Sequence, residues 1–534
     1  MRTVSKFCTL FIFFFASFLA SGRTKETKSQ SLLKHEINFI IQASKTPRTI
    51  KAVEIYSRKN KKILFQANSQ LLLRPASNLK IITTSFALQN LGGGYNFKTG
   101  FLISGTRHGN TIDGNLIVST CGDPIITHAD LDSVAGIISQ NGIETINGNL
   151  VIDVSEFDSL QWGAGWMWDD EPGDYQMFIS PACLDHNTIT VDVSLDSINN
   201  RLSITLKPQT GFVRFLSTAV ADTLDSLFVT RIMNDDTNTI LVSGKYSGHL
   251  HPYEDDFSVR HPAHYFGTVF KEMLGKHGIE VHGEVLTEPR DRKQETRNAT
   301  VTLFTLEHSI DTVITYINKV SDNLGAECLL RKVPNEICGQ IGSADNGITL
   351  EGNFLRQCGV DSTEFYIADG SGLSHYDLIT PAAIVKVLSY DLTQPTDGPN
   401  VGSGDIFFHS LPLAGKDGTL EKRMCQEFVT GKVIAKTGSI SGVSTLSGYV
   451  LLPKDTLVFS MMMQNFIASG DTMRALQDSL CSVLVLYNDN YRTFARNLRH
   501  HDIGTYRAIH RKHPKQEHEP HRRIKRRKHS RTGD

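Results

Sequence analysis

The hydrophobic pattern divides the chain into helical stretches near its two ends and strand-like stretches between them. Short runs that alternate apolar or β-branched residues with polar ones, bounded by Gly, Asn or Asp, are typical of strands. They are densest from about residue 96 to about residue 300. The strand-like runs are 52–58, 61–68, 114–120, 148–157, 188–194 and 201–208, and the helical runs are 79–91, 309–323 and 472–487. The pattern therefore predicts helical outer thirds around a strand-rich block.

The first 22 residues form a pattern of their own. Arg2 and Lys6 precede an apolar run from Phe7 to Ala20, and the small residues Ala20 and Gly22 suit a signal-peptidase site. We therefore predict a signal peptide over 1–22 and secretion across the inner membrane. An uncleaved anchor is the alternative, although this run of 14 residues is shorter than the roughly 20 that a transmembrane helix needs. Since the chain has neither a cell-wall sorting motif nor a lipobox, we expect a periplasmic protein.

The last 36 residues, 499–534, differ in charge from the rest. They hold twelve Lys or Arg, four Asp or Glu and seven His, a net charge of +8. The whole chain has a net charge of −1, so residues 1–498 carry −1 − 8 = −9. With almost no large apolar side chains this tail is predicted to be disordered. It suits an anionic envelope polymer or a membrane surface, and nucleic acid is not expected; a solvated tail without a partner is the alternative.

The composition is that of an ordinary globular protein. Hydrophobic residues make up 40% and charged residues 21%, which argues against a disordered chain. Eight Cys are too few for a disulfide-built scaffold, and the absence of a CxxC pair argues against a zinc site. We expect no metal and no cofactor. Among the seven Cys that follow the signal, Cys328 and Cys338 are the only close pair that suggests a bridge.

The first motif with chemical meaning is Ser77-Asn78-Leu79-Lys80, at the start of a predicted helix. A three-residue spacing places Ser77 and Lys80 on one helix face, so the lysine amine can reach the hydroxyl. A serine hydroxyl is a weak nucleophile until a base removes its proton, and a lysine with a lowered pKa can be that base. Alone, the spacing more often marks a helix cap with a solvated lysine.

Two further motifs change this interpretation. Ser321-Asp322-Asn323 lies 244 residues after Ser77, and Lys436-Thr437-Gly438 lies between strand-like segments. The order SxxK, SDN, KTG is that of the penicilloyl-serine enzymes. The long interval between the first two motifs indicates a large insertion, which the strand-rich block fills.

The chain resembles the low-molecular-mass class C penicillin-binding proteins, the D-alanyl-D-alanine carboxypeptidase and endopeptidase family S13. The resemblance extends from about residue 35 to about residue 490, through the blocks RPASNLK, GDPIITHADL, GWMWDD, SDNLGAECLLR, DGSGLSHYDLITP, LPLAGKDGTLEKRM and AKTGSISGVSTLSGYV. It implies an α+β fold: a β-lactamase/transpeptidase-like domain of helices on a five-stranded antiparallel sheet. This domain would comprise residues 23–95 and 301–490, and a strand-rich insert of two subdomains would occupy 96–300.

The resemblance also implies roles for the motif residues. It makes Ser77 the nucleophile toward the D-Ala-D-Ala end of peptidoglycan stem peptides or cross-links, Lys80 its base, and Ser321 a proton relay between Lys80 and Lys436. Penicillin and other β-lactams would acylate Ser77. Substrate would be held by Asn323, Lys436, Thr437, Gly438 and Ser439, and the oxyanion would meet the backbone N–H groups of Ser77 and Ser439.

Recognition of the stem-peptide side chain follows a less regular pattern. The resemblance implies that Asp170 and Tyr175, in WDDEPGDY, bind the free amino end of a diaminopimelate side chain; a solvated surface loop is the alternative. In the DGSGLS block this chain has His375 where the family has an arginine that meets the substrate carboxylate. Histidine is shorter and only partly charged near neutral pH, so the residue that binds this carboxylate is left open.

Two other functions remain open on the same fold. A serine β-lactamase would need a base that activates the deacylating water, and no loop of the ExxxN type stands out. A noncatalytic peptidoglycan-binding protein would not need all three motifs intact, although the basic tail suits such a scaffold.

Overall fold

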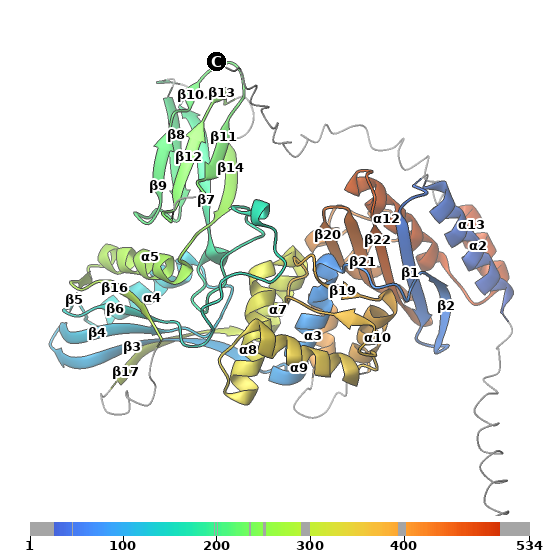
Figure 1. Ribbon diagram of the computed structural model, residues 1–534, viewed down its shortest axis with the longest axis horizontal. Coiled ribbons are helices and arrows are strands. Elements are labelled where there is room, and N and C mark those ends of the chain that lie inside the picture. Colours follow the sequence, from blue (N-terminus) through green and yellow to red (C-terminus); the bar gives the residue numbers. More distant parts are fainter. Residues whose placement is uncertain are drawn as a thin grey trace, which may run out of the picture.

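The computed structural model describes residues 26–501, apart from 45, 197, 200, 234–235, 249–251, 290–299 and 394–401. The predicted signal peptide and the tail from residue 502 onward lie outside the described residues. No helix in the described part of the chain is both long enough and apolar enough to cross a membrane. Figure 1 shows a body with a central sheet, a second sheet beside it, and a lobe of short strands above the second sheet.

The central sheet joins the two ends of the chain. Its five strands follow the order β2-β1-β22-β21-β20, and every neighbouring pair is antiparallel. The first two strands come from the N-terminal segment and the other three from the C-terminal segment, so the sheet confirms the predicted transpeptidase-like domain. The strands are β1 (Ile50–Ser57), β2 (Lys62–Ala67), β20 (Val433–Ile440), β21 (Val443–Leu452) and β22 (Asp455–Gln464).

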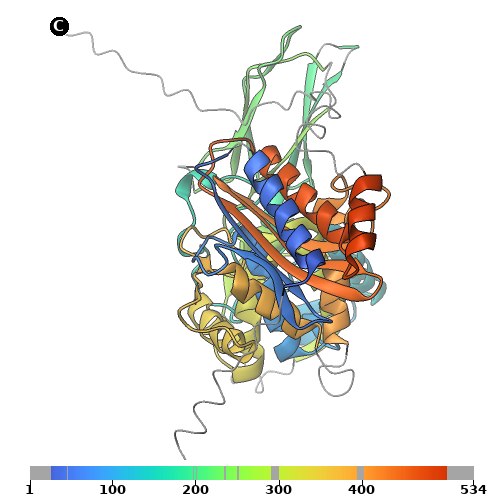
Figure 2. The same cartoon turned by 90° about the vertical axis from the view of Figure 1, so that its right-hand side faces the viewer.

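Helices cover both faces of this sheet. Strands β21 and β22 are buried along most of their length, as expected for strands covered on both sides. Figure 2 shows α2, α12 and α13 packed on one face. A second group of helices, which includes α3 directly after Ser77, lies on the opposite face. The helices of the two layers are α2 (Lys28–Ala43), α12 (Gly470–Leu486) and α13 (Tyr491–His500), and α3 (Leu79–Leu91), α8 (Asn323–Cys338), α9 (Ala344–Gln357), α10 (Pro381–Asp391) and α11 (Ser403–Ser410).

The helix predicted over 309–323 is interrupted just where the second motif lies. Helix α7 (Ile310–Tyr316) passes into a π-helical turn, Ile317–Ser321, and Ser321 takes a left-handed backbone conformation with φ 69°. Asp322 then caps α8, because its carboxylate accepts a hydrogen bond from Gly325 N at 2.8 Å. The break turns the Ser321-to-Asn323 segment away from a continuous helix and toward α3.

The strand-rich block forms two further layers of structure. A seven-stranded sheet contains the path β15-β5-β4-β3-β17; β6 also pairs with β4, and β16 pairs with β6. Helices α4 and α5 lie with this sheet in one hydrophobic core. The upper lobe holds three small sheets. The elements are β3 (Asn96–His108), β4 (Thr111–Ser119), α4 (His128–Gln140), β5 (Thr145–Ile146), β6 (Leu150–Asp153), β7 (Thr188–Asp196), β8 (Arg201–Lys207), β9 (Arg214–Ser217), β10 (Val220–Ala221), β11 (Phe228–Arg231), β12 (Thr239–Ser243), β13 (Lys245–Tyr246), β14 (Tyr253–Ser258), α5 (Pro262–Lys276), β15 (Glu280–Val281), β16 (Val285–Glu288) and β17 (Thr300–Ser309).

Strand β17 links the two regions, because it pairs with β3 from Thr300 to Ser309 and leads directly into α7. The division of the chain at residues 96 and 300 stays a prediction. A two-stranded sheet, β18 (Phe365–Tyr366) with β19 (Leu378–Ile379), brackets the segment that contains the DGSGLS block.

The suggested bridge between Cys328 and Cys338 is wrong, because helix α8 holds the two residues apart. Both residues lie on α8, ten positions apart, which corresponds to a rise of about 15 Å along a helix. A disulfide requires Cα atoms within roughly 7 Å. Cys328 is buried and Cys338 is exposed, so the sequence proximity reflects a helix rather than a loop.

The separate core of the strand-rich block gives a test of its independence. Phe270 on α5 is fully buried and packs edge-to-face on Phe101 of β3, with ring centroids 5.2 Å apart. We expect Phe270→Ala to lower the free energy of unfolding by about 3 to 5 kcal/mol. We also expect penicillin labelling of the folded variant to persist, because its core is distinct from the one around α3. Denaturant unfolding with parallel labelling measures both, and Phe86→Ala, in the α3 core, is the control that should lose labelling.

Candidate active site

Ser77 lies on a short helical turn that leads into α3. This turn, Ala76–Asn78, is followed by the mostly buried helix α3. Lys80 is the second residue of α3, one turn after Ser77, and its Nζ donates to Ser77 Oγ at 3.1 Å. Ser77 is half-buried while Lys80 is fully buried. The partly exposed serine hydroxyl is therefore held next to a buried lysine amine.

The second motif supplies the next partners of the two lysines. Lys80 Nζ donates to Asn323 Oδ1 at 2.5 Å, and Ser321 Oγ accepts a hydrogen bond from Lys436 Nζ at 2.8 Å. The structure thus brings Lys80 and Lys436 to the same short segment, but each contacts a different residue of it. The side-chain amide of Asn323 also donates to the carbonyl of Tyr175 at 2.7 Å.

The third motif lies on β20, directly against the Ser77 turn. A Cβ atom at Gly438 would lie 2.9 Å from Ser77 N and 2.3 Å from Thr445 Oγ1, so only glycine allows the strand to come this close. Ser439 follows as an exposed residue, and Thr437 Oγ1 donates to Thr419 Oγ1 at 2.8 Å. The edge strand of the central sheet and the Ser77 turn are therefore in direct contact.

Asn78, the residue after Ser77, fixes that arrangement and was not singled out by the sequence. Its amide donates to the carbonyl of Lys436 at 2.8 Å, and its oxygen accepts from Ser447 Oγ at 2.6 Å. It is completely buried. No spacing rule points to an asparagine inside SxxK, because its partners lie more than 350 residues away.

A turn in the DGSGLS block completes the surroundings of Lys80. The carbonyl of Ser371 accepts from Lys80 Nζ at 2.7 Å. The buried carboxylate of Asp369 holds the turn, accepting from the backbone N–H groups of residues 371, 372 and 374. The sequence predicts Asp369 and Ser371 as turn residues, and the turn presents a carbonyl to the lysine. Glu327 on α8 was missed; its Oε1 accepts from the N–H groups of Gly370 and Ser371.

The two lysines have different electrostatic environments. Burial lowers the pKa of Lys80 to about 8, although the carboxylates of Asp369, Asp322, Glu327 and Asp377 favour its charged form. Burial, together with the positive charge of Lys80, holds the pKa of Lys436 well below its usual range. Because the carboxylates favour the charged form of Lys80, the repulsion between the two ammonium groups lowers the pKa of Lys436.

Asp170 and Tyr175, which both belong to the strand-rich block, form a hydrogen-bonded pair. Tyr175 Oη donates to Asp170 Oδ1 at 3.1 Å. Burial raises the pKa of the Asp170 carboxyl, while the tyrosine hydrogen bond and the nearby His375 lower it. Burial and Asp170 raise the pKa of Tyr175 to about 12. His375 therefore lies close enough to Asp170 for their charges to interact.

His375 has a cationic neighbour that the sequence did not indicate. Arg74 Nη1 lies 3.3 Å from His375 Nδ1. Because a guanidinium can only donate, His375 Nδ1 is the acceptor in this contact. Arg74 precedes Ser77 by three residues, and its carbonyl accepts from Gln464 Nε2 at 2.6 Å. A guanidinium is thus present beside the position where the family has an arginine.

The fold and the lysine-flanked serine define a penicilloyl-serine enzyme. Residues 33–484 match the model of the D-Ala-D-Ala carboxypeptidase 3 (S13) family, and the chain belongs to this family. The predicted family and its class, serine D-alanyl-D-alanine carboxypeptidases, are therefore confirmed. Within the described part of the chain, no group of three or more His, Cys, Asp and Glu side chains is arranged to hold a metal ion.

Individual relatives agree with this assignment. The chain is 29% identical to a D-alanyl-D-alanine carboxypeptidase of Actinomadura sp. (strain R39) over 473 residues, 85% of each protein. It is 27% identical to the D-alanyl-D-alanine carboxypeptidase DacB of Haemophilus influenzae over 413 residues, 77% of this chain and 84% of the relative. The crystal structure of penicillin binding protein 4 from Haemophilus influenzae matches with a TM-score of 0.71 and 25% identity, covering 85% of this chain and 99% of the other.

The buried environment of Lys80 predicts the pH dependence of acylation. If Lys80 must lose its proton before it can accept one from Ser77, kcat/KM should rise with pH up to about 8, the pKa that burial gives Lys80, and level off above it. Stopped-flow acylation by a chromogenic penicillin, measured from pH 6 to 10, tests this expectation.

Asn323→Asp is the matched control for this profile. It places a carboxylate beside Lys80 Nζ, which should raise the lysine pKa and move the rising limb to higher pH. A limb that stays in place would assign the titration to another group.

Proposed function

We propose that Ser77 attacks the carbonyl between the two terminal D-alanine residues of a peptidoglycan stem peptide. Its Oγ forms a bond to the carbonyl carbon, its proton passes to the Lys80 amine, and D-alanine leaves with a proton returned to its nitrogen. Water then hydrolyses the ester. The observation that carries this proposal is the 3.1 Å contact between Ser77 Oγ and Lys80 Nζ inside a buried, carboxylate-lined pocket. The same steps cleave a cross-link when the leaving amine belongs to a second stem peptide.

The second and third motifs support this chemistry from the other side of the cleft. Ser321 Oγ, which accepts from Lys436, donates its proton to the leaving nitrogen and takes one from the Lys436 ammonium, while Lys80 keeps the proton of Ser77 until the ester is hydrolysed. Lys436 and Thr437 receive the terminal carboxylate. An arriving carboxylate raises the pKa of Lys436, and the charge that Lys436 then gains lowers the pKa of Lys80. Substrate binding thereby prepares the base.

Asn323 has a more restricted role than the one implied by sequence. Its Oδ1 accepts from Lys80 and one Nδ2 hydrogen goes to Tyr175, so a single N–H remains for the substrate amide. The oxyanion forms between the backbone N–H groups of Ser77 and Ser439. Gly438 supports this arrangement, since it lets the strand approach the Ser77 turn.

Side-chain recognition uses charges of both signs. We propose that the carboxylate of a diaminopimelate side chain binds the guanidinium of Arg74 next to His375, and that its ammonium binds Asp170 beside Tyr175. The 3.3 Å contact between Arg74 and His375 and the electrostatic effect of His375 on Asp170 support a compact pair of opposite charges.

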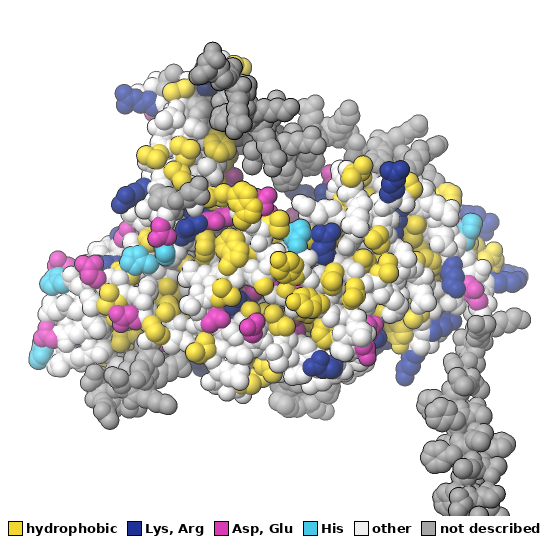
Figure 3. Space-filling model, viewed as in Figure 1, with side chains coloured by type: hydrophobic (Ala, Val, Ile, Leu, Met, Phe, Trp, Pro, Cys, Tyr) yellow, Lys and Arg dark blue, Asp and Glu magenta, His cyan; other side chains and the backbone are white. Residues whose placement is uncertain are grey.

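The chain is proposed to act outside the inner membrane, with 1–22 as a cleaved signal and the periplasm as its compartment. The basic tail, 499–534, would then contact anionic headgroups or an envelope polymer. Exposed arginines 492, 496 and 499 on α13 support this, because they continue the tail charge onto the folded surface. Figure 3 shows further basic side chains at the end of the body where β1 and β2 lie. Arg58, Lys59 and Lys61, at the turn between these two strands, are exposed.

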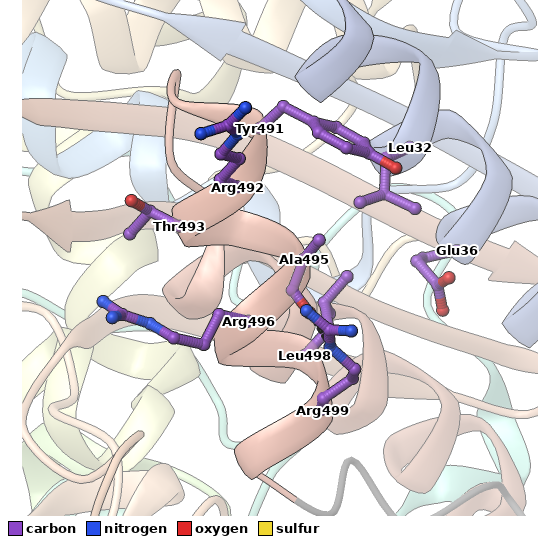
Figure 4. Close-up of a pocket in the computed structure, with 9 residues that line it drawn as sticks. All are labelled: Leu32, Glu36, Tyr491, Arg492, Thr493, Ala495, Arg496, Leu498 and Arg499. Carbon is purple, nitrogen blue, oxygen red and sulfur yellow. Dashed lines mark hydrogen bonds between the residues drawn. The ribbon is translucent and has the colours of Figure 1, made fainter.

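A groove between α2 and α13 lies within this basic end. Its cavity volume is about 690 Å³. Leu32, Tyr491, Ala495 and Leu498 line it together with the three arginines and Glu36 (Figure 4). A groove lined by apolar side chains and by three arginines suits an amphiphile with an anionic head, such as a phospholipid.

Ser77→Ala tests the central proposal. The variant should keep its thermal unfolding midpoint but lose both covalent labelling by fluorescent penicillin and release of D-alanine from a stem pentapeptide. For the wild type, a stable adduct with D-alanine release supports the peptidase, rapid turnover of the label a β-lactamase, and no adduct a noncatalytic scaffold. A label that maps to another residue in Ser77→Ala would remove Ser77 from the mechanism.

Arg74→Gln tests carboxylate recognition. Losing a charge-assisted hydrogen bond costs about 1.5 to 3 kcal/mol, so KM for a diaminopimelate peptide should rise roughly 10- to 150-fold while kcat stays nearly constant. The same peptide with its side-chain carboxyl amidated is the control, and its KM should not change between wild type and variant. Equal losses on both peptides would show that Arg74 only supports the fold of the Ser77 turn.

Truncation after His501 tests the tail and preserves α13. The shortened enzyme should cleave a small soluble peptide at the wild-type rate but sediment less with vesicles that contain anionic phospholipid. Binding of the full chain should fall steeply with salt, because screening limits the reach of charges to about 8 Å at physiological ionic strength. If the shortened chain binds equally well, the tail is a solvated extension. Replacing the three arginines of α13 by glutamine then tests whether this helix binds the vesicles.

A further inference from the structure

Two cysteines from distant parts of the chain face each other in the interior. Cys183 Sγ and Cys328 Sγ are 3.7 Å apart, although 145 residues separate them in sequence. Both side chains are fully buried. Both thiols converge on the carbonyl of Ser180, at 3.1 Å from Cys183 and 3.9 Å from Cys328. The two sulfurs are thus directed toward the same point.

The surroundings of this pair are apolar and closely packed. The two cysteines share a small hydrophobic cluster with Phe157, Trp166, Met177, Ile179, Leu324 and Leu373. Hydrogen bonding to Cys328 and burial raise the pKa of Cys183 well above its usual range, which disfavours the Cys183 thiolate once the protein has folded. An S–S bond of about 2.05 Å would require the sulfurs to move about 1.7 Å closer.

We propose that Cys183 and Cys328 are joined by a disulfide that fastens the strand-rich block to helix α8. The bond forms as the chain folds, when a disulfide-bearing oxidant exchanges with one thiolate and the second thiolate displaces it. The two cysteines are oxidised, lose two protons, and leave the oxidant as two thiols. This inference shares with the proposed function only the export of the chain to an oxidising compartment.

The position of the bond gives it a role at the active site. Cys328 follows Asn323 by five residues on α8, and Cys183 follows Tyr175 by eight. The Tyr175 carbonyl holds the amide of Asn323, which in turn contacts Lys80. A covalent link therefore fixes both sides of the contact through which the strand-rich block orients Asn323.

Thiol counting on the mature chain is the direct test. The chain from Arg23 onward is refolded from denaturant with oxidised glutathione, so the result does not depend on export. Alkylation in denaturant should then modify five cysteines, the seven present less the two that are bridged, and all seven after reduction. Peptide mapping should recover one disulfide-linked pair that contains Cys183 and Cys328. Seven reactive thiols without reduction, or a linked pair of other cysteines, would overturn the proposal.

A second measurement connects the bond to stability and activity. Reducing agent should lower the thermal midpoint of the wild type by several degrees but leave that of a Cys183→Ala/Cys328→Ala variant unchanged. Reduced wild type should lose penicillin acylation at temperatures where the oxidised form is active. Cys338→Ser, in the exposed end of α8, is the matched control and should respond to reductant as the wild type does. An identical shift in the double variant would assign the redox response elsewhere.

Discussion

The buried ammonium group of Lys80 is the charge around which the active site is arranged. Its three hydrogen bonds go to Ser77 Oγ, Asn323 Oδ1 and the carbonyl of Ser371, which belong to three separate segments of the chain. An ammonium has three donors, so all of them are used. Because an unpaired buried charge is costly, the three segments must come together for the core around α3 to form.

The same charge links the site to the strand-rich block. Asp369 holds the turn whose carbonyl meets Lys80, and Trp166 of the block donates its indole N–H to Asp369 at 2.9 Å. On the other side, the Tyr175 carbonyl holds Asn323. Residues of the strand-rich block thus support two of the three acceptors of Lys80. The block is therefore part of the framework that holds Lys80 in place.

The two lysines differ in the charged groups that surround them. Four carboxylates favour the charged form of Lys80. The neighbours of Lys436 are instead the like charge of Lys80 and a serine hydroxyl. In the proposed mechanism, a substrate carboxylate supplies the negative charge that Lys436 lacks, so substrate binding also lowers the pKa of Lys80. Without substrate that pKa is about 8, and Lys80 stays protonated below this pH.

The sequence by itself determined the local features of this protein. The helix 79–91, the strand runs 52–58 and 61–68 and the three motifs follow from short-range spacing, and the order of the motifs indicated the family. Only the tertiary structure decided which distant residues meet: Asn78 with Ser447, Arg74 with His375, and Cys328 with Cys183 rather than Cys338. It also interrupted the predicted helix at Ser321. The physical reason is that periodicity reports which face of an element is buried, whereas hydrogen bonds and sulfur contacts depend on how separate elements pack.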